Sequence, residues 1–340
     1  MKKWRILCLL AVAVIVCVLI LCAVLPKSSN VEAQTFPWPG DGSATVSDLV
    51  FGSDSSGLDY RDGKLYAVDN GNARVWILDV LSDGSVDFDP EYAEEMRVLF
   101  PDGQTKPDAE GITVDSEGNV YLASESGPGQ FYFSRSYILQ LPQDARSGEV
   151  VARQAWDLGF SLPLVRANKG IEAVEWVSND DLKGLLYDQK AGVPYDPDRY
   201  PKAVSDGVLF VALEGNGHIY ALVLNQDGSV VRILDVDSGL GGAMALEYDA
   251  EEKALWVAAD DNHGNRAAVL SFNGTRDPRL VHVTPPDGID ASLNYEGFAM
   301  DPASGGGSRR VYRFCDGVQQ EQLSLGSIAP GYAGTLFPEK

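Results

Sequence analysis

The sequence predicts an all-β protein built as a β-propeller, because one hairpin pattern recurs along the chain at intervals of 52 to 72 residues. The pattern is clearest over residues 108–125, where an apolar run, a turn at Asp115 to Asn119 and a second run ending on Glu125 predict two antiparallel strands. Repeats of this kind, made only of strands, are typical of propeller blades. We therefore expect four-stranded blades around a central channel.

Five copies of the hairpin are recognisable. Their equivalent positions are Ser56, Glu110, Glu172, Met244 and Glu296, which gives spacings of 54, 62, 72 and 52 residues. Two further apolar runs follow each hairpin and complete a four-stranded blade. The sequence thus predicts five blades, with a sixth left open, in a domain over residues 48–330 that is followed by a C-terminal tail over residues 331–340.

The segment before the first hairpin has two expected parts. Residues 34–47 are rich in Pro, Gly and small polar residues and are expected to form a linker. The sequence predicts one extra strand over Thr45 to Phe51. The fifth copy, in contrast, lacks a fourth strand after its third strand near residues 322–325. We expect this N-terminal strand to complete the last blade, which closes the ring and removes its exposed edges.

The first 33 residues are expected to form a signal peptide or an N-terminal membrane anchor. Lys2, Lys3 and Arg5 precede twenty uncharged residues from Ile6 to Leu25. This length fits a membrane anchor, whereas the small residues ending at Ala33 fit a signal-peptide cleavage site, and the two interpretations stay open. Either one predicts an exported domain that is secreted, periplasmic or membrane-anchored, with membrane contact only through an uncleaved N-terminal segment.

Charge and cysteine content agree with export. The chain has a net charge of −22, and because residues 1–33 contribute +3, the remainder carries −25. A domain this acidic repels phosphate backbones, so no nucleic-acid partner is expected. Three of the four cysteines lie in the N-terminal segment. Cys315 is left alone and is expected to be a small buried apolar group.

The third repeat contains an insertion of about thirty residues between Trp176 and Val208. Its prolines at positions 194, 197 and 201 exclude a long helix. The insertion joins the innermost strand to its neighbour at the end of the blade opposite the carboxylates discussed next. We therefore favour a structural or partner-contact role for it over a lid.

Three of the five equivalent hairpin positions are glutamates: Glu110, Glu172 and Glu296. Innermost strands surround the channel of a propeller, so we expect these side chains at the channel mouth. Carboxylates this close together need a cation if all are to ionise, and oxygen ligands select Ca²⁺ or Mg²⁺. An irregular ring suits Ca²⁺ better, and the sequence thus predicts a calcium site formed by these three glutamates.

A second tier of acidic residues ends the second strand of each hairpin. These residues are Asp69, Glu125, Glu214, Asp260 and Asp316. As a group they are expected to be solvated turn residues or acceptors of backbone hydrogen bonds, with Asp69, Glu214 and Asp260 also candidate ligand contacts. Glu125 and His263 are the candidate catalytic bases, and Lys169 and Arg266 are candidates for pairing an anionic group.

Three short sequence segments resemble a known family: residues 108–112, 168–173 and 294–299. They resemble the Glu-Gly repeats of the phytase-like domain family, also described as the esterase-like activity of phytase family, and of the related SdiA-regulated family. The resemblance spans about residues 55–320 and implies an exported, calcium-dependent propeller with hydrolysis of phosphoric or carboxylic esters as the family label. Ser56 and Met244 depart from the glutamate pattern, and the sequence shows no dense Lys and Arg cluster for a polyphosphate such as phytate.

Two classes of function stay open. One is an extracytoplasmic binding protein whose metal stabilises the ring or holds a small-molecule or cell-surface ligand. The other is a metal-dependent hydrolase of phosphoric or carboxylic esters, or a lactonase, with a metal at the channel mouth. The sequence contains neither a nucleophile elbow nor a zinc-protease motif. Binding is therefore slightly favoured.

Overall fold

The computed structural model describes residues 33–42, 44–45, 49–92, 95–129, 132–302, 307–318 and 322–338. The expected signal peptide or anchor over residues 1–33 therefore lies, apart from Ala33, outside the described residues. Within the described stretches, no helix has both the length and the apolar character needed to pass through a bilayer.

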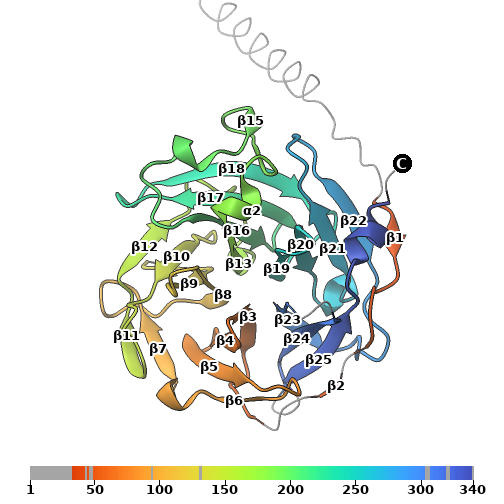
Figure 1. Cartoon of the computed structure of the whole chain (residues 1–340). Helices are drawn as coiled ribbons and strands as arrows, with labels where there is room; N and C mark the ends of the chain where they lie inside the picture. Colours follow the sequence, from red (N-terminus) through yellow and green to blue (C-terminus); the bar gives the residue numbers. More distant parts are fainter. Residues whose placement is uncertain are drawn as a thin grey trace, which may run out of the picture. The chain divides into compact units, whose positions relative to one another are not determined.

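The described residues form five main sheets arranged as blades around one axis (Figure 1). From the innermost strand outward, blade 1 contains β3 (Ser55–Arg61), β4 (Lys64–Asp69), β5 (Arg74–Val80) and β7 (Met96–Leu99). Blade 2 contains β8 (Ala109–Val114), β9 (Val120–Ser124), β10 (Tyr137–Gln140) and β12 (Gln154–Asp157). Blade 3 contains β13 (Ile171–Ser178), β16 (Gly207–Leu213), β17 (His218–Leu224) and β18 (Val230–Asp237).

The last two blades follow the same order. Blade 4 contains β19 (Ala245–Asp249), β20 (Ala254–Ala258), β21 (Ala267–Ser271) and β22 (Arg279–Val283). Blade 5 contains β23 (Asn294–Asp301), β24 (Arg309–Asp316) and β25 (Leu323–Ile328). The innermost strands contact one another in the closed order β23, β3, β8, β13, β19 and back to β23. The ring of the described chain therefore has five blades, and the alternative of a sixth is not needed to close it.

The N-terminal strand completes blade 5, as predicted. Strand β2 (Ala44–Thr45) pairs antiparallel with β25 at its outer edge. The predicted bounds, Thr45 to Phe51, are wrong, because residues 49–51 are not a strand and residues 46–48 lie outside the described residues. The Phe51 backbone N–H donates to Gln322 Oε1 at 2.7 Å rather than to a neighbouring strand.

Additional short strands cover the outer edges of other blades. Strand β6 (Val86–Phe88) pairs with β5 in blade 1, and β11 (Gly148–Val151) pairs in parallel with β7 of the same blade. Strand β1 (Thr35–Phe36), in the segment predicted as a linker, pairs in parallel with β22 of blade 4. These pairings satisfy outer-edge backbone groups that would otherwise be exposed.

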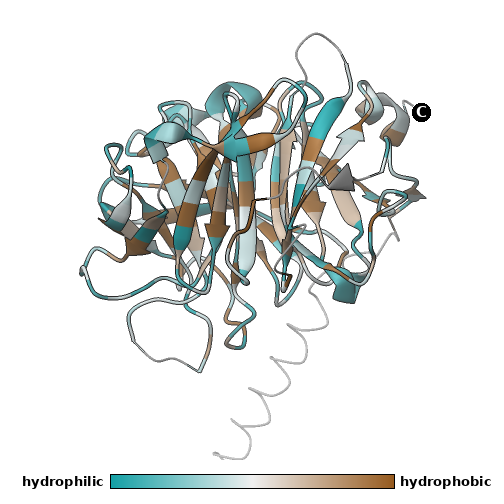
Figure 2. Cartoon of the chain, turned by 90° about the horizontal axis from the view of Figure 1, so that it is seen from below, coloured by the Kyte–Doolittle hydropathy of each residue, from teal (hydrophilic) through white to brown (hydrophobic). Residues whose placement is uncertain are grey.

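Among the described residues, five hydrophobic cores hold the ring together, one between each pair of neighbouring blades. Side chains alternate along each strand, so one blade contributes to the core on each of its two faces. Trp156 lies in the core between blades 2 and 3 and Trp256 in the core between blades 4 and 5, and both are fully buried. Cys315 is also fully buried, in β24. Figure 2 shows the hydrophobic residues concentrated in the strands.

The insertion of blade 3 packs against the ring. It contains α2 (Asn179–Leu182), the two-stranded β14 (Tyr187–Asp188) and β15 (Val193–Pro194), and the 3₁₀ turn Pro197–Arg199. Leu182, Leu186 and Tyr195 are buried in the core between blades 3 and 4. The insertion follows the end of β13, whereas Glu172 lies at its start. The C-terminal helix α3 (Tyr332–Leu336) is also packed, and its Tyr332 hydroxyl accepts a hydrogen bond from Trp256 Nε1 at 2.7 Å.

Phe51 is expected to be critical for ring closure. Its ring meets Trp76 of blade 1 and Phe314 of blade 5 at centroid distances of 5.4 and 4.9 Å. Phe51→Ala should lower the free energy of unfolding by about 3–5 kcal/mol, because it leaves a cavity at the junction of the first and last blades. Chemical denaturation measures this loss. The control is Val50→Ala, since Val50 is 63% exposed; equal stability of the two variants would contradict this role for Phe51.

Candidate metal centre at the channel mouth

Four innermost strands carry a β-bulge at the same place. The register shifts lie between Ser55 and Leu58 in β3, Ala109 and Gly111 in β8, Ile171 and Ala173 in β13, and Tyr295 and Gly297 in β23. The extra residues in the last three are Glu110, Glu172 and Glu296. A bulge re-aims the side chain of its extra residue, so the glutamates leave the regular alternation of their strands.

The glycine after the bulge has a separate role. A Cβ on Gly111 would lie 2.7 Å from the backbone N of Val174 in the next blade. A Cβ on Gly297 would lie 2.5 Å from the carbonyl O of Ser56, and one on Gly57 would lie 2.7 Å from the Cα of Gly111. The glycines therefore allow neighbouring innermost strands to approach at backbone contact. Each Glu-Gly pair combines an inward-aimed carboxylate with a close contact between blades.

We call Glu110, Glu172 and Glu296 the mouth glutamates. Glu110 and Glu172 are 5% and 8% exposed, and Glu296 is partly buried. Burial and the nearby charge of Glu296 raise the pKa of Glu110 well above its usual range. Burial, with Glu110 and other carboxylates including Glu296, does the same to the pKa of Glu172. Burial, followed by Asp316, raises the pKa of Glu296 to about 8. The structure thus brings the three predicted residues into one electrostatic cluster.

Polar neighbours orient the mouth glutamates. Ser56 Oγ donates to Glu110 Oε2 at 3.0 Å, and Asn70 Nδ2 donates to Glu110 Oε1 at 3.0 Å. Asn294 Nδ2 donates to Glu296 Oε1 at 2.8 Å. Ser56, which breaks the glutamate pattern in the first repeat, therefore supports the glutamate of the second.

The tightest group of ligand atoms at the mouth differs from the predicted set. Oxygens of Asp108, Glu110 and Glu125 lie within 4.8 Å of one another, whereas Glu172 and Glu296 are not part of this group. Glu125, which the sequence suggested as a base, is 3% exposed and accepts hydrogen bonds from the Gly170 N–H and from Ser134 Oγ. Asp108 was not singled out from the sequence, although it lies two residues before Glu110. A cluster of this kind can hold a metal ion.

The other candidate contacts have local partners. Asp69 accepts from Arg74 Nη2 at 2.9 Å and from the Asn72 N–H at 3.0 Å. Lys169 Nζ pairs with Glu214 Oε1, so the predicted anion-pairing lysine already has a carboxylate. These pairs neutralise part of the second acidic tier.

Asp260, His263 and Arg266 form one local network in the turn after β20. Asp260 Oδ1 lies 2.7 Å from His263 Nδ1 and also accepts from the His263 backbone N–H. Arg266 Nε donates to the His263 carbonyl at 3.0 Å. The pKa of Lys169 is raised mainly by its hydrogen bond to Glu214 and that of Glu296 mainly by burial, and the charge of Asp260 adds a smaller rise to both, which places this network beside the mouth.

The chain matches the family model described as "Phytase-like: Esterase-like activity of phytase" over residues 52–237, more than half of its length. It belongs to this phytase-like family, which confirms the resemblance seen in the sequence. The matched residues span blades 1 to 3 and include Glu110 and Glu172 but not Glu296. No curated protein matches the sequence.

Several solved structures are similar to this phytase-like propeller at low identity. Myxococcus xanthus glutaminyl cyclase is 11% identical with a TM-score of 0.42, and the match covers 86% of this chain and 97% of that one. A streptogramin B lyase is 11% identical with a TM-score of 0.41 over 86% and 99% of the two chains. The Pseudomonas aeruginosa periplasmic gluconolactonase is 13% identical with a TM-score of 0.38 over 78% and 67%.

Glu296 gives a prediction for the pH dependence of stability in the absence of metal. Its pKa rises from 4.5 to about 8 on folding, so between these pH values the folded state binds more protons than the unfolded state. The free energy of unfolding contributed by this group therefore falls as pH rises from 5 to 8. Glu296→Gln should reduce that fall, measured by urea denaturation after metal removal. The control is the exposed Glu117→Gln, and an unchanged pH slope in Glu296→Gln would contradict the prediction.

Proposed function

We propose that the protein is an exported, calcium-binding phytase-like propeller that holds an oxygen-rich small-molecule or cell-surface ligand at its channel mouth. The convergence of buried carboxylates on Glu110 carries this proposal. Oxygens of Asp108, Glu110 and Glu125 lie within 4.8 Å of one another. Glu296 is also close enough to Glu110 for its charge to add to the effect of burial on the Glu110 pKa. Like charges brought together in a buried site favour a cation that neutralises them.

The chemistry of the donor set supports Ca²⁺. All candidate ligands are carboxylate oxygens, which hard cations prefer, and Ca²⁺ binds six to eight oxygen ligands, waters included, in irregular geometry. Hydrogen bonds from Ser56 and Asn70 to Glu110, and from Ser134 to Glu125, hold the ligands in place without the ion. Such outer partners are typical of metal sites.

The charges around the mouth favour a ligand bound through the cation. Lys169 is paired with Glu214, and Arg74 is paired with Asp69. Neither basic residue is therefore available to hold a polyphosphate, which argues against phytate as the ligand. A ligand with a few carboxylate, phosphate or carbonyl oxygens could instead complete the coordination of Ca²⁺.

Export rests on the N-terminal segment. The uncharged stretch from Ile6 to Leu25 after three basic residues supports either a cleaved signal peptide or a membrane anchor. The acidic remainder, with its single cysteine, fits an extracytoplasmic protein that needs no disulfide. A nucleic-acid partner is not part of this proposal, because a charge of −25 outside residues 1–33 repels it.

A second candidate function is ester or lactone hydrolysis at the same mouth, and the Asp260 and His263 pair favours it. The Asp260 carboxylate accepts a hydrogen bond from the Nδ1–H group of His263, which leaves Nε2 unprotonated. The His263 side chain is 30% exposed, so Nε2 can accept a proton from a water molecule. A bound cation would polarise the ester or lactone carbonyl, or a phosphoryl oxygen. His263 would then take the proton of the attacking water, with Asp260 orienting its ring.

Calcium should raise the thermal stability of the protein. After exhaustive chelation, Ca²⁺ at a hundredfold excess over its dissociation constant adds about 2.7 kcal/mol to the free energy of unfolding for one site. The Glu110→Gln, Glu172→Gln double variant should lose the part of this gain that comes from the mouth while remaining folded, because glutamine keeps the shape and the hydrogen-bond acceptor. Glu117→Gln is the matched control. A calcium response of wild-type size in the double variant would contradict the proposed mouth site.

Hydrolysis is tested separately with 4-nitrophenyl phosphate, 4-nitrophenyl acetate and a γ-lactone as probes. If the second candidate is right, one of them is turned over only with Ca²⁺ present, and His263→Gln lowers kcat about 10²- to 10⁴-fold, as expected for loss of a general base. The variant should keep its calcium-dependent stability. Calcium-loaded protein that turns over none of the three probes would contradict hydrolysis and leave the binding function standing.

A further inference from the structure

A second set of carboxylates lies further along the innermost strands. Asp59 in β3, Glu175 in β13 and Glu247 in β19 each follow, by three residues, the hairpin position that is equivalent to the mouth glutamates. These positions are Ser56, Glu172 and Met244. We call Asp59, Glu175 and Glu247 the inner carboxylates. Glu172 and Glu175 are separated by a rise of roughly 10 Å along the strand. Regular alternation would point residues three apart to opposite faces, but the bulge at Glu172 changes that relation.

Hydrogen bonds between blades hold two of the inner carboxylates. In blades 2, 3 and 4, a backbone N–H at the unpaired edge of the innermost strand donates to a side chain of the preceding blade. The pairs are Asp59 Oδ2 with the Val114 N–H at 2.7 Å, Thr113 Oγ1 with the Trp176 N–H at 2.9 Å, and Glu175 Oε1 with the Tyr248 N–H at 3.2 Å. Burial raises the pKa of Glu247 well above its usual range, and the Met300 N–H of the following blade opposes this rise only in part.

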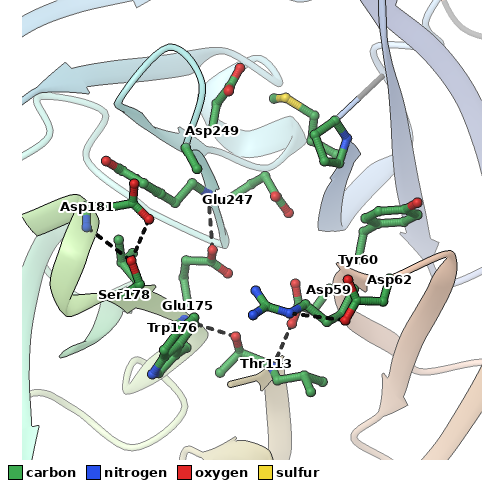
Figure 3. A pocket seen from close by; sticks show the side chains of 17 residues that line it. Asp59, Tyr60, Asp62, Thr113, Glu175, Trp176, Ser178, Asp181, Glu247 and Asp249 are labelled. Atoms are coloured by element: carbon green, nitrogen blue, oxygen red, sulfur yellow. Dashed lines mark hydrogen bonds and ion pairs between the residues drawn. The ribbon is translucent and has the colours of Figure 1, made fainter. Parts of the chain in front are cut away.

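The inner carboxylates converge on one point. One oxygen each of Asp59, Glu175 and Glu247 lies within 4.8 Å of the others, and the three residues are 5%, 5% and 4% exposed. Figure 3 shows their side chains around the same space. They come from blades 1, 3 and 4, so a group bound between them would connect three blades across the channel.

Glu247 supplies an independent sign of a missing partner. Its Oε2 atom is buried and has no hydrogen-bond partner among the residues that the structure describes. A buried carboxylate oxygen without a donor is costly, and such an atom in a folded protein calls for an ion or a water at that place. Because two other carboxylates lie within 4.8 Å, a cation would satisfy this oxygen and would also offset the neighbouring negative charges, which a neutral water would not.

The charges facing the inner carboxylates leave an excess of negative charge. Arg61 is the one basic side chain among the described residues that line the cavity, and it lowers the pKa of Asp59 and Glu175. Its guanidinium lies 5.2 Å from the Trp176 ring centroid and 3.8 Å from Asp62. Burial nevertheless raises the pKa of Asp59 to about 7, and it raises the pKa values of Glu175 and Glu247 well above their usual range. One arginine therefore does not neutralise three buried acids.

An ion can reach this place from solvent. The inner carboxylates line a cavity of about 280 Å³ whose other walls include Asp62 and Asp181. The Asp62 side chain is 94% exposed, so the cavity extends to the surface. The volume is several times the roughly 30 Å³ occupied by one water, and it leaves room for a hydrated ion. Asp181 belongs to α2, which gives the blade 3 insertion a place beside the cavity.

We propose that Asp59, Glu175 and Glu247 form a second cation site for a hard divalent ion such as Ca²⁺ or Mn²⁺. Its ligands are carboxylate oxygens from three blades, oriented by backbone amides of the following blades. The site lies further along the innermost strands than the mouth glutamates and does not depend on the function proposed for the mouth. A bound ion ties blades 1, 3 and 4 together and leaves coordination positions open toward the cavity.

Terbium luminescence tests this site in the full-length chain. Tb³⁺ occupies calcium sites with oxygen ligands, and its emission is excited through a nearby indole such as Trp176, which lines the cavity. Chelated protein should give Tb³⁺ emission on tryptophan excitation, and Ca²⁺ should compete it away. Trp176→Phe should lower the signal several-fold, and Glu175→Gln with Glu247→Gln should abolish it. The Glu110→Gln, Glu172→Gln variant should retain it.

The outcomes separate the two sites. Absence of tryptophan-sensitised emission in the wild type would overturn the second site, and so would emission that is lost in the mouth variant but kept in the Glu175→Gln, Glu247→Gln variant. Neither result would contradict the proposal that Ca²⁺ bound at the mouth stabilises the protein. If the double variant unfolds, Asp59→Asn provides the same test, because asparagine keeps the acceptor for the Val114 N–H. Unchanged Tb³⁺ emission in folded Asp59→Asn would also overturn the proposal.

Discussion

The close approach of the five innermost strands is the constraint on which the structure depends. Gly57, Gly111 and Gly297 stand where a Cβ would collide with the backbone of an adjacent blade. Without side chains at these points, β23, β3, β8 and β13 pack at backbone distance around a narrow axis. Side chains that leave these strands toward the channel then meet side chains from the other blades, whatever their charge.

Both carboxylate clusters follow from this geometry. At the mouth, a bulge aims Glu110, Glu172 and Glu296 into the shared space, and amide and hydroxyl side chains support two of them. Deeper in the ring, side chains of one blade accept from the free backbone edge of the next, and Asp59, Glu175 and Glu247 converge as a result. Such acids would be costly if they served only as hydrogen-bond acceptors, since Thr113 fills the same role in blade 2 without a charge. Carboxylates at these positions therefore argue for a cation.

The sequence predicted much of this fold because each blade repeats the same hairpin. The repeat identified five blades, the N-terminal closure and the common position of the mouth glutamates. It did not give the length of the closing strand, since nothing local shows that the Phe51 N–H would bond to a side chain 271 residues away.

The inner carboxylates were missed for a physical reason. In a regular strand Glu172 and Glu175 would face opposite sides, and the bulge that changes this depends on pairing with β16 rather than on local sequence. Asp108 was missed because it precedes the repeated position, although the structure groups it with Glu110 and Glu125. Equivalent positions in a repeat thus predict which residues share a ring, but not which oxygens come within ligand distance.

Anomalous diffraction from crystals of the protein grown with Mn²⁺ or Ca²⁺ tests the central claim most directly, because it locates a bound ion without reference to activity. We expect an anomalous peak among Asp108, Glu110 and Glu125, beside Glu172 and Glu296, and a second peak between Asp59, Glu175 and Glu247. A map without any peak at the mouth, from crystals containing millimolar metal, would contradict the claim that these carboxylates gather to hold a cation.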